Sequence, residues 1–136
     1  MNLEYSMEKI KIEKIMSDSF VSVDSSISAT DAAKMMERDD VGAVMVLENG
    51  FPIGIITDRD FAIKITAHSY PLDTPVRRVM SSPLISIDST SDLQIAFDLM
   101  SSRKVRTLPV IDEEKIVGIV TSSGIVKYLS KHLKQR

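Results

Sequence analysis

The first half of the chain alternates between short apolar runs and one segment with helical spacing. Residues 20–23 form an apolar-polar alternation that predicts a short strand, and residues 41–47 are nearly all apolar, which predicts a buried strand. Between them, apolar residues recur at helical spacing as far as Arg38, and Ser28 precedes Asp31 by three residues. We therefore predict an amphipathic helix that is capped by Ser28 and ends near Arg38.

A hairpin and a second helix complete this half. Asn49 and Gly50 lie between two apolar runs, a strong signal for a tight hairpin turn. Residues 53–57 are then the return strand, and Thr57-Asp58-Arg59-Asp60 opens a helix that extends to about residue 67. The unit is therefore strand, helix, strand, strand, helix.

The second half repeats this order. Residues 15–61 align without a gap on the residues 64 positions later, and 12 of these 47 pairs are identical. About three identities are expected by chance at ordinary residue frequencies. The second copy predicts strands at 84–87, 106–111 and 116–121 and helices at 92–102 and 122–133. Two similar halves imply a pseudo-twofold axis, and a cleft between such halves is a natural place for a ligand.

The start of the second helix carries candidate binding chemistry. Thr57 lies at a strand end and a helix start, where its hydroxyl and the positive end of the helix can meet a phosphate. Asp60, one turn into the helix, has a carboxylate that can accept hydrogen bonds from two ribose hydroxyls. The alternative is purely structural, because Thr is a common helix cap and Asp is favourable in a first helical turn.

Each copy resembles a CBS domain, and the tandem resembles a Bateman module. The resemblance is carried by Ile15-Met16-Ser17 and Val79-Met80-Ser81, by the strand 106–112, and by Gly54-Ile55-Ile56-Thr57-Asp58-Arg59-Asp60 with its counterpart 118–121. It covers residues 10–133. It divides the chain into a lead-in (1–14), a first repeat (15–67), a connector (68–78), a second repeat (79–133) and a basic tail (134–136).

The resemblance implies a fold and a function. The fold is of the α/β (α+β) class, with two pseudo-twofold-related small sheets packed face to face and helices outside. The function is regulatory binding of AMP, ADP, ATP or S-adenosylmethionine between the repeats, with no cofactor required. It also implies a homodimer that passes the bound state to an effector protein, whose identity the sequence does not give.

The family pattern assigns binding roles to positions in both repeats. Asp60 is expected to hold the ribose, with Thr57 beside it and Arg59 as a weaker candidate. Arg106, whose counterpart is Gly42, is expected to contact phosphates, since Arg is always charged and offers a planar fork of donors. The residues expected to form an apolar slot for a purine are Ile55, Val105 and Pro109.

The second copy departs from the pattern at one position. It reads Thr121-Ser122-Ser123-Gly124, so that Gly124 stands where the first copy has Asp60. Glycine has no side chain to hold a ribose. We expect two unequal sites, with a weak or empty second site at Thr121.

Composition limits the other function classes. Cysteine is absent, which excludes disulfides and thiolate chemistry, and the net charge of −2 argues against a general nucleic-acid binder. The two histidines, His68 and His132, have no metal-ligand spacing, and no nucleophile elbow or phosphate-binding loop motif is present. We expect neither an enzyme nor a metal site. The apolar runs are too short to cross a membrane and no leader is recognisable, so we expect a cytoplasmic protein.

Two alternatives to a nucleotide sensor stay open. The first is a scaffold that dimerises without a ligand, through helix faces carrying Phe61, Ile65, Ile125 and Leu129. The second, weaker one is nucleic-acid binding through the basic residues at 77–78, 103–104 and 131–136, although no aromatic residues are interleaved for base stacking.

Overall fold

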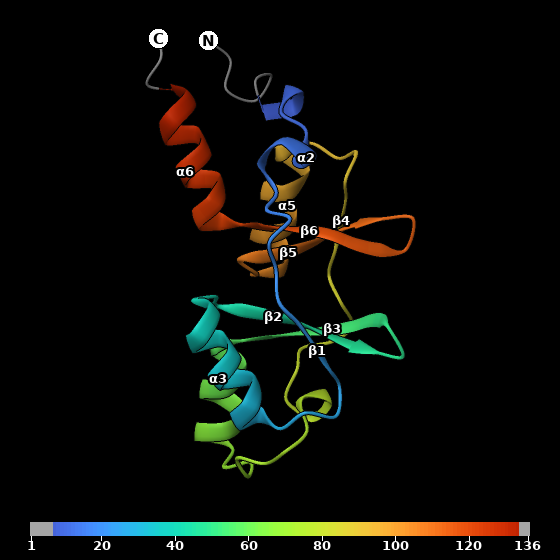
Figure 1. Ribbon diagram of the computed structural model, residues 1–136. Helices are drawn as coiled ribbons and strands as arrows, with labels where there is room; N and C mark the ends of the chain where they lie inside the picture. Colours follow the sequence, from blue (N-terminus) through green and yellow to red (C-terminus); the bar gives the residue numbers. More distant parts are fainter. Residues whose placement is uncertain (1–6, 134–136) are drawn as a thin grey trace. The chain divides into compact units, whose positions relative to one another are not determined.

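The computed structural model describes residues 7–133, and the basic tail and the first six residues of the lead-in lie outside this range. The chain forms two compact units (Figure 1). Residues 20–84 make up one of them, called the Asp60 unit below. The other, called the Gly124 unit, combines residues up to 19 with residues from 85 onward. The chain thus leaves the Gly124 unit after Ser19, completes the Asp60 unit, and returns at Ile85.

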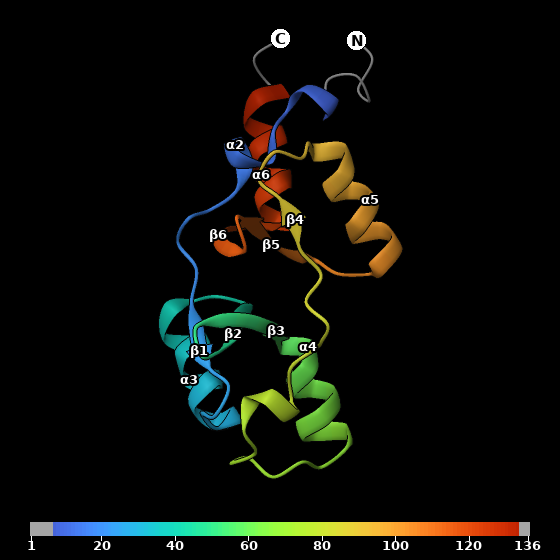
Figure 2. The ribbon, with the colours of Figure 1, turned by 90° about the vertical axis from the view of Figure 1, so that its right-hand side faces the viewer.

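The Asp60 unit is built on a three-stranded sheet in the order β1-β2-β3. Strand β1 (Ser22–Asp24) pairs parallel to β2 (Ala43–Glu48), and β2 pairs antiparallel to β3 (Phe51–Thr57). Helix α3 (Ala29–Asp39) connects β1 to β2. The short helix α4 (Asp58–Asp60) continues directly into the π-helix η1 (Phe61–Ala67), as Figure 2 shows, and the 3-10 helix η2 (Val76–Arg78) follows.

Local sequence explains the ends of these elements. The Ser28 side chain accepts a hydrogen bond from the Asp31 main-chain nitrogen at 3.0 Å and so caps α3. Asn49 and Gly50 have φ values of 51° and 81°, as a tight turn of the twisted hairpin requires. These predictions are confirmed, although β1 begins two residues later than residue 20.

The core of the Asp60 unit lies between its sheet and its helices. Val44 and Val46 of β2 pack with Ala32 and Met36 of α3, and Val76 and Val79 close the same cluster. Val76 lies within the predicted connector (68–78) and Val79 directly follows it, so the end of the connector is part of the unit's core.

The Gly124 unit repeats this arrangement with β4 (Ile87–Asp88), β5 (Thr107–Asp112) and β6 (Lys115–Thr121). Helix α5 (Leu93–Arg103) connects β4 to β5, and α6 (Ser122–Leu133) follows β6, as predicted. The prediction for β4 was too long at its start, since only two residues pair with β5.

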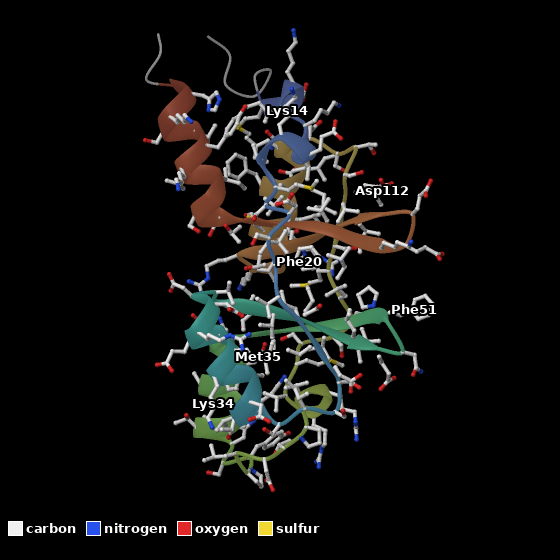
Figure 3. All side chains as sticks on the ribbon, viewed as in Figure 1. Lys14, Phe20, Lys34, Met35, Phe51 and Asp112 are labelled. Atoms are coloured by element: carbon white, nitrogen blue, oxygen red, sulfur yellow. The ribbon has the colours of Figure 1, made fainter. Side chains whose placement is uncertain are left out.

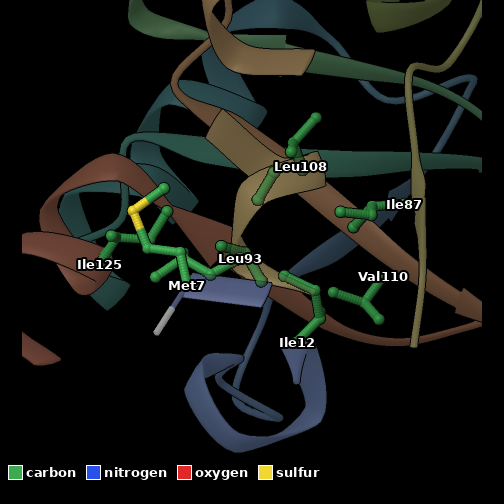
Figure 4. Close-up of a cluster of buried hydrophobic side chains, with 9 residues drawn as sticks. Met7, Ile12, Ile87, Leu93, Leu108, Val110 and Ile125 are labelled. Carbon is green, nitrogen blue, oxygen red and sulfur yellow. The ribbon is translucent and has the colours of Figure 1, made fainter. Parts of the chain in front are cut away.

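The lead-in belongs to the core of the Gly124 unit. It contains helix α2 (Ile12–Ile15), and Ile12 is fully buried. Figure 4 shows Met7 and Ile12 together with Leu93 of α5 and Ile125 of α6. Ile125 is 1% exposed, so the prediction that it lies on a helix face free for a dimer was wrong.

The segments before the first strand of each repeat, residues 15–17 and 79–81, occupy equivalent places in the two units. The Ser17 nitrogen bonds the Ile119 carbonyl at 2.8 Å, and the Ser81 nitrogen bonds the Ile55 carbonyl at the same distance. Residues 15–17 begin the first sequence repeat but pack on the second, and residues 79–81 do the reverse. The compact units therefore divide the chain differently from the sequence repeats.

Candidate functional site

The candidate site is centred on the Asp60 carboxylate, where β3 ends and a helix begins. Thr57 is the last residue of β3 and the N-cap of α4, and Asp60 is the third helical residue. Asp60 Oδ2 accepts hydrogen bonds from the Thr57 nitrogen at 2.9 Å and from Thr57 Oγ1 at 3.2 Å. These contacts make Asp60 the carboxylate half of a capping box, which fixes its orientation.

The other carboxylate oxygen meets two residues that the sequence analysis did not assign to the site. Asp60 Oδ1 accepts a hydrogen bond from Ser81 Oγ at 2.7 Å and lies 3.5 Å from Lys64 Nζ. Lys64 Nζ also donates to the main-chain carbonyls of Val79 at 2.7 Å and Met80 at 2.9 Å. The one signal for Lys64 in the sequence is its position four residues after Asp60, because such residues are neighbours on a helix.

Asp60 is thus a buried anion with a cation beside it. The residue is 7% exposed, and the Lys64 side chain is 26% exposed. Buried charges persist in proteins when they are paired and hydrogen-bonded, as both of these are. The arrangement holds a carboxylate in a fixed orientation at the end of β3.

The equivalent place in the Gly124 unit has the cap without the carboxylate. Thr121 Oγ1 accepts a hydrogen bond from the Gly124 nitrogen at 2.9 Å and lies 3.3 Å from Ser123 Oγ. Tyr128 stands at the position of Lys64 and stacks on His132, with ring centroids 3.9 Å apart. The two helix starts therefore differ in their capacity to hold a polyhydroxyl ligand.

Two further predicted residues of the Asp60 unit lie near Thr57 in the chain. Ile55 is half-buried on β3 opposite Met45 of β2, and Arg59 is exposed on α4. Space is open beside β2, because a Cβ atom added at Gly42 would meet no atom within 4 Å.

The remaining predicted residues belong to the Gly124 unit. Arg106 is exposed before β5, and its carbonyl accepts a hydrogen bond from the Ser122 nitrogen at 2.9 Å. Val105 packs against the core of this unit, and Pro109 is buried on β5 opposite Ile119. The structure thus gathers Ile55, Thr57, Arg59 and Asp60 on one unit, and the predicted pairing of Asp60 with Arg106 stays a prediction.

No group of three or more His, Cys, Asp or Glu side chains within residues 7–133 is arranged to hold a metal ion. Over the same residues, no helix combines the length and the apolar character needed to cross a membrane.

Comparison with known proteins decides the family. The family model described as CBS domain matches this chain twice, over residues 12–66 and 76–131. The chain belongs to the CBS-domain family. Pairs of CBS domains generally act as regulatory ligand-binding modules.

Similar proteins occur in bacteria and archaea. A CBS domain-containing protein of Bacillus subtilis, YhcV, is 36% identical over 109 residues, which cover 80% of this chain and 78% of that protein. Hypoxic response protein 1 of Mycobacterium tuberculosis is 31% identical, over 76% of this chain and 73% of its own. Other relatives are longer: this CBS pair spans 53% of an uncharacterized protein of Methanopyrus kandleri and 33% of one from Methanocaldococcus jannaschii.

Solved structures share the fold. An uncharacterized conserved protein of Pyrococcus horikoshii superposes with a TM-score of 0.85 at 28% identity, covering 89% of this chain and 92% of that one. A structure described as Hypoxic Response Protein I with two coordinated zinc ions has a TM-score of 0.78 at 29% identity, covering 88% and 98%. These matches confirm the α/β fold of a CBS pair.

Proposed function

We propose that this CBS pair is a regulatory module that binds an adenine nucleotide and passes the bound state to a partner protein. The observation that carries the proposal is the Asp60 carboxylate, which is held in place at the end of β3 and has no counterpart at Gly124. A carboxylate can accept hydrogen bonds from both hydroxyls of a ribose, which every adenine nucleotide contains.

Arg106 is the proposed phosphate contact. Its guanidinium is always charged and can bind a phosphate through two parallel hydrogen bonds. Asp60 would therefore bind the nucleoside part of the ligand, and Arg106 would bind its charged phosphates. Ile55, Val105 and Pro109 are proposed to contact the base, and Thr57 and Arg59 to lie beside the ribose and phosphates.

Calorimetric titration and thermal unfolding with AMP, ADP, ATP and S-adenosylmethionine test the proposal. A ligand with a dissociation constant of about 10 μM, present at about 1 mM, should stabilise the protein by about 2.7 kcal/mol. Asp60→Ala should weaken adenosine and AMP alike, whereas Arg106→Ala should weaken AMP much more than adenosine. The control is Asp98→Ala, which removes the same charge from an exposed position on α5.

The Gly124 unit offers a test by gain of function. If the missing carboxylate is what weakens the second site, Gly124→Asp should raise the number of nucleotides bound per chain from one towards two. A folded Asp60→Ala protein with the parent's affinity would refute the ribose assignment. Stabilisation by S-adenosylmethionine alone would replace the proposed adenine-nucleotide sensor by a sensor of that compound.

One observation favours a second candidate, a scaffold that dimerises without a ligand. The Asp60 unit has an apolar groove of about 410 Å³, whose lining includes Phe61 and Ile65 of η1 and Ala33 of α3. Lys34, labelled in Figure 3, and Glu37 carry opposite charges three residues apart in the same lining. In a two-fold dimer, the same groove would meet itself, and Lys34 of one copy can face Glu37 of the other.

The oligomeric state tests the scaffold. Light scattering after size exclusion should find a dimer for the parent, a monomer for Ala33→Glu in the groove, and a dimer for Ser101→Glu, the control at an exposed position on α5. A monomeric parent would remove this candidate. A dimer whose mass and melting temperature do not change with any nucleotide would favour the scaffold over the sensor.

A further inference from the structure

The Asp60 carboxylate is already fully engaged within the protein. Oδ2 accepts from the main-chain nitrogen and the hydroxyl of Thr57, and Oδ1 accepts from Ser81 Oγ and Lys64 Nζ. An ionised carboxylate has about four acceptor positions. A ligand hydroxyl that binds this carboxylate must therefore replace a contact that exists now.

The Ser81 hydroxyl is the contact that is easiest to replace. The Thr57 nitrogen and hydroxyl are both engaged in the capping box of α4. Lys64 Nζ is fastened by the Val79 and Met80 carbonyls at 2.7 and 2.9 Å. Ser81 is an exposed residue, so its hydroxyl can rotate and bond to water once it leaves Asp60. The displaced group is therefore predicted to be Ser81 Oγ.

The Gly124 unit shows what a serine does at this place without the carboxylate. Ser17 occupies the position equivalent to Ser81, and its Oγ bonds within its own turn, to the Ser19 carbonyl at 3.3 Å and the Ser19 nitrogen at 3.2 Å. Both serines pair with a strand through their main chains, Ser17 with Ile119 and Ser81 with Ile55. The side-chain link to the helix start is therefore specific to the unit that has Asp60.

The location of Ser81 gives this link a consequence. Ser81 lies three residues before the end of the Asp60 unit, where the chain passes to the Gly124 unit. Lys64 holds the two residues before it by their carbonyls. Asp60 and Lys64 thus fasten the departing segment 79–81 to the helix that carries the candidate site.

We propose that Lys64 and Ser81 are positioning residues of the Asp60 site, and that a ribose-containing ligand releases segment 79–81 by displacing the Ser81 hydroxyl from Asp60. Lys64 keeps the carboxylate in place in both states, while Ser81 competes with the ligand. The inference rests on the proposed function and adds to it a route by which binding reaches the connection between the units.

Calorimetric titration with AMP and with adenosine tests the competition. Ser81→Ala removes the competing donor and should tighten both ligands by about tenfold to a hundredfold, the range expected for a hydrogen bond to a charged group. Ser81→Thr retains the hydroxyl and should keep the parent's affinity. Ser17→Ala is the matched control in the Gly124 unit and should change nothing.

The direction of the change separates this role from a merely structural one. A serine that only supports the fold would lower the affinity, or leave it unaltered, when it becomes alanine, and either result would overturn the competition. Lys64→Met should weaken both ligands by about tenfold or more, because Asp60 loses the group that holds it. Unaltered binding by a folded Lys64→Met protein would overturn the assignment of Lys64.

Amide hydrogen exchange tests the link without any nucleotide. The Ile55 and Ser81 amides report on segment 79–81 through their mutual bonds of 3.2 and 2.8 Å, and the Ser17 and Ile119 amides are the internal reference. In the ligand-free protein, Ser81→Ala should accelerate exchange at the first pair several-fold and not at the second. Equal exchange at the first pair in the parent and in Ser81→Ala would overturn the link.

The two measurements distinguish failure of the inference from failure of the proposed function. If neither adenosine nor AMP, ADP, ATP or S-adenosylmethionine binds the parent or any variant, the proposed function and the competition both fail, and the exchange data still decide whether the link exists. If AMP binds the parent and exchange at Ile55 and Ser81 stays as slow as before, the release is refuted while the nucleotide site stands.

Discussion

Replacing Gly54 with alanine should destabilise the protein, because the segment that crosses β3 leaves no room for a methyl group. A Cβ atom at Gly54 would lie 2.6 Å from Met80 Sδ and 2.8 Å from the Ser81 carbonyl oxygen. The sulfur belongs to a flexible side chain that can move, but the carbonyl belongs to a main chain held by Ile55. Segment 79–81 must therefore move away from β3.

The size of the effect follows from these contacts. Overpacking of this kind costs about 1–3 kcal/mol, and we expect about 2 kcal/mol because one of the two clashes is with main chain. For a chain of this length, that corresponds to a fall in melting temperature of about 8 °C. Gly42→Ala is the matched control, since its Cβ would meet no atom within 4 Å, and it should change the stability by less than about 0.5 kcal/mol.

Urea unfolding, followed by circular dichroism, measures both variants against the parent. The reasoning would be refuted by a Gly54→Ala protein as stable as Gly42→Ala, because the close approach of segment 79–81 to β3 would then not be a rigid feature. Amide exchange at Ile55 in the same samples reports whether the loss is local to the crossing.

Three further predictions concern single interactions. Ser28→Ala removes the cap of α3 and should lower the free energy of unfolding by about 1 kcal/mol in urea titrations, and an unchanged midpoint would contradict the role of the cap. Hydrogen bonds from Ser26 lower the pKa of Asp24 below its usual range, so the stability that this carboxylate contributes is present above about pH 4 and is lost as the pH falls through the lowered pKa. Asp24→Asn should therefore reduce the acid-induced loss of stability measured by thermal unfolding. Identical pH profiles for the parent and the variant would argue against this contribution. Lys64→Met leaves two main-chain carbonyls without their donor and should cost about 1–3 kcal/mol, whereas Lys127→Met, at an exposed position on α6, should be neutral; equal effects would contradict the contacts described.

Short-range signals in the sequence predicted most of the fold. Ser28 was predicted to cap its helix, and its side chain accepts a hydrogen bond from the main-chain nitrogen three residues later. Asp92, predicted as the first residue of its helix, is the cap of α5 in the same way. Asn49-Gly50 predicted its hairpin because few residues other than asparagine and glycine accept positive φ at both positions. Strand β4 was less predictable, since its pairing with β5 covers two residues and depends on tertiary contacts rather than on local pattern.

The repeat in the sequence could not predict that the segment before each first strand packs on the sheet of the other repeat. An alignment at constant offset identifies Ile12 with Val76 as equivalent residues, but it does not say on which copy each one packs. Both residues are fully buried. Ile12 lies in the core of the Gly124 unit, and Val76 lies in the core of the Asp60 unit. The path of the chain between the units determines on which copy each residue packs.

The candidate site was predictable in part. Thr57 and Asp60 were found because a hydroxyl and a carboxylate at a helix start have a recognisable spacing. Ser81 was recognised only as part of a family motif, since it lies 21 residues from Asp60 in the sequence. The two residues meet because segment 79–81 passes beside β3. Lys64 was missed because a lysine on a helix is usually solvated, and only the structure places its ammonium against two carbonyls.

The division of the chain into units also determines how the protein would respond to mechanical force. Residues 7 and 133 both belong to the Gly124 unit, and the Asp60 unit is an insertion between Ser19 and Ile85. Tension applied across residues 7 and 133 therefore loads the Gly124 unit first. The unit that carries Asp60 stays outside the line of tension until its neighbour has yielded.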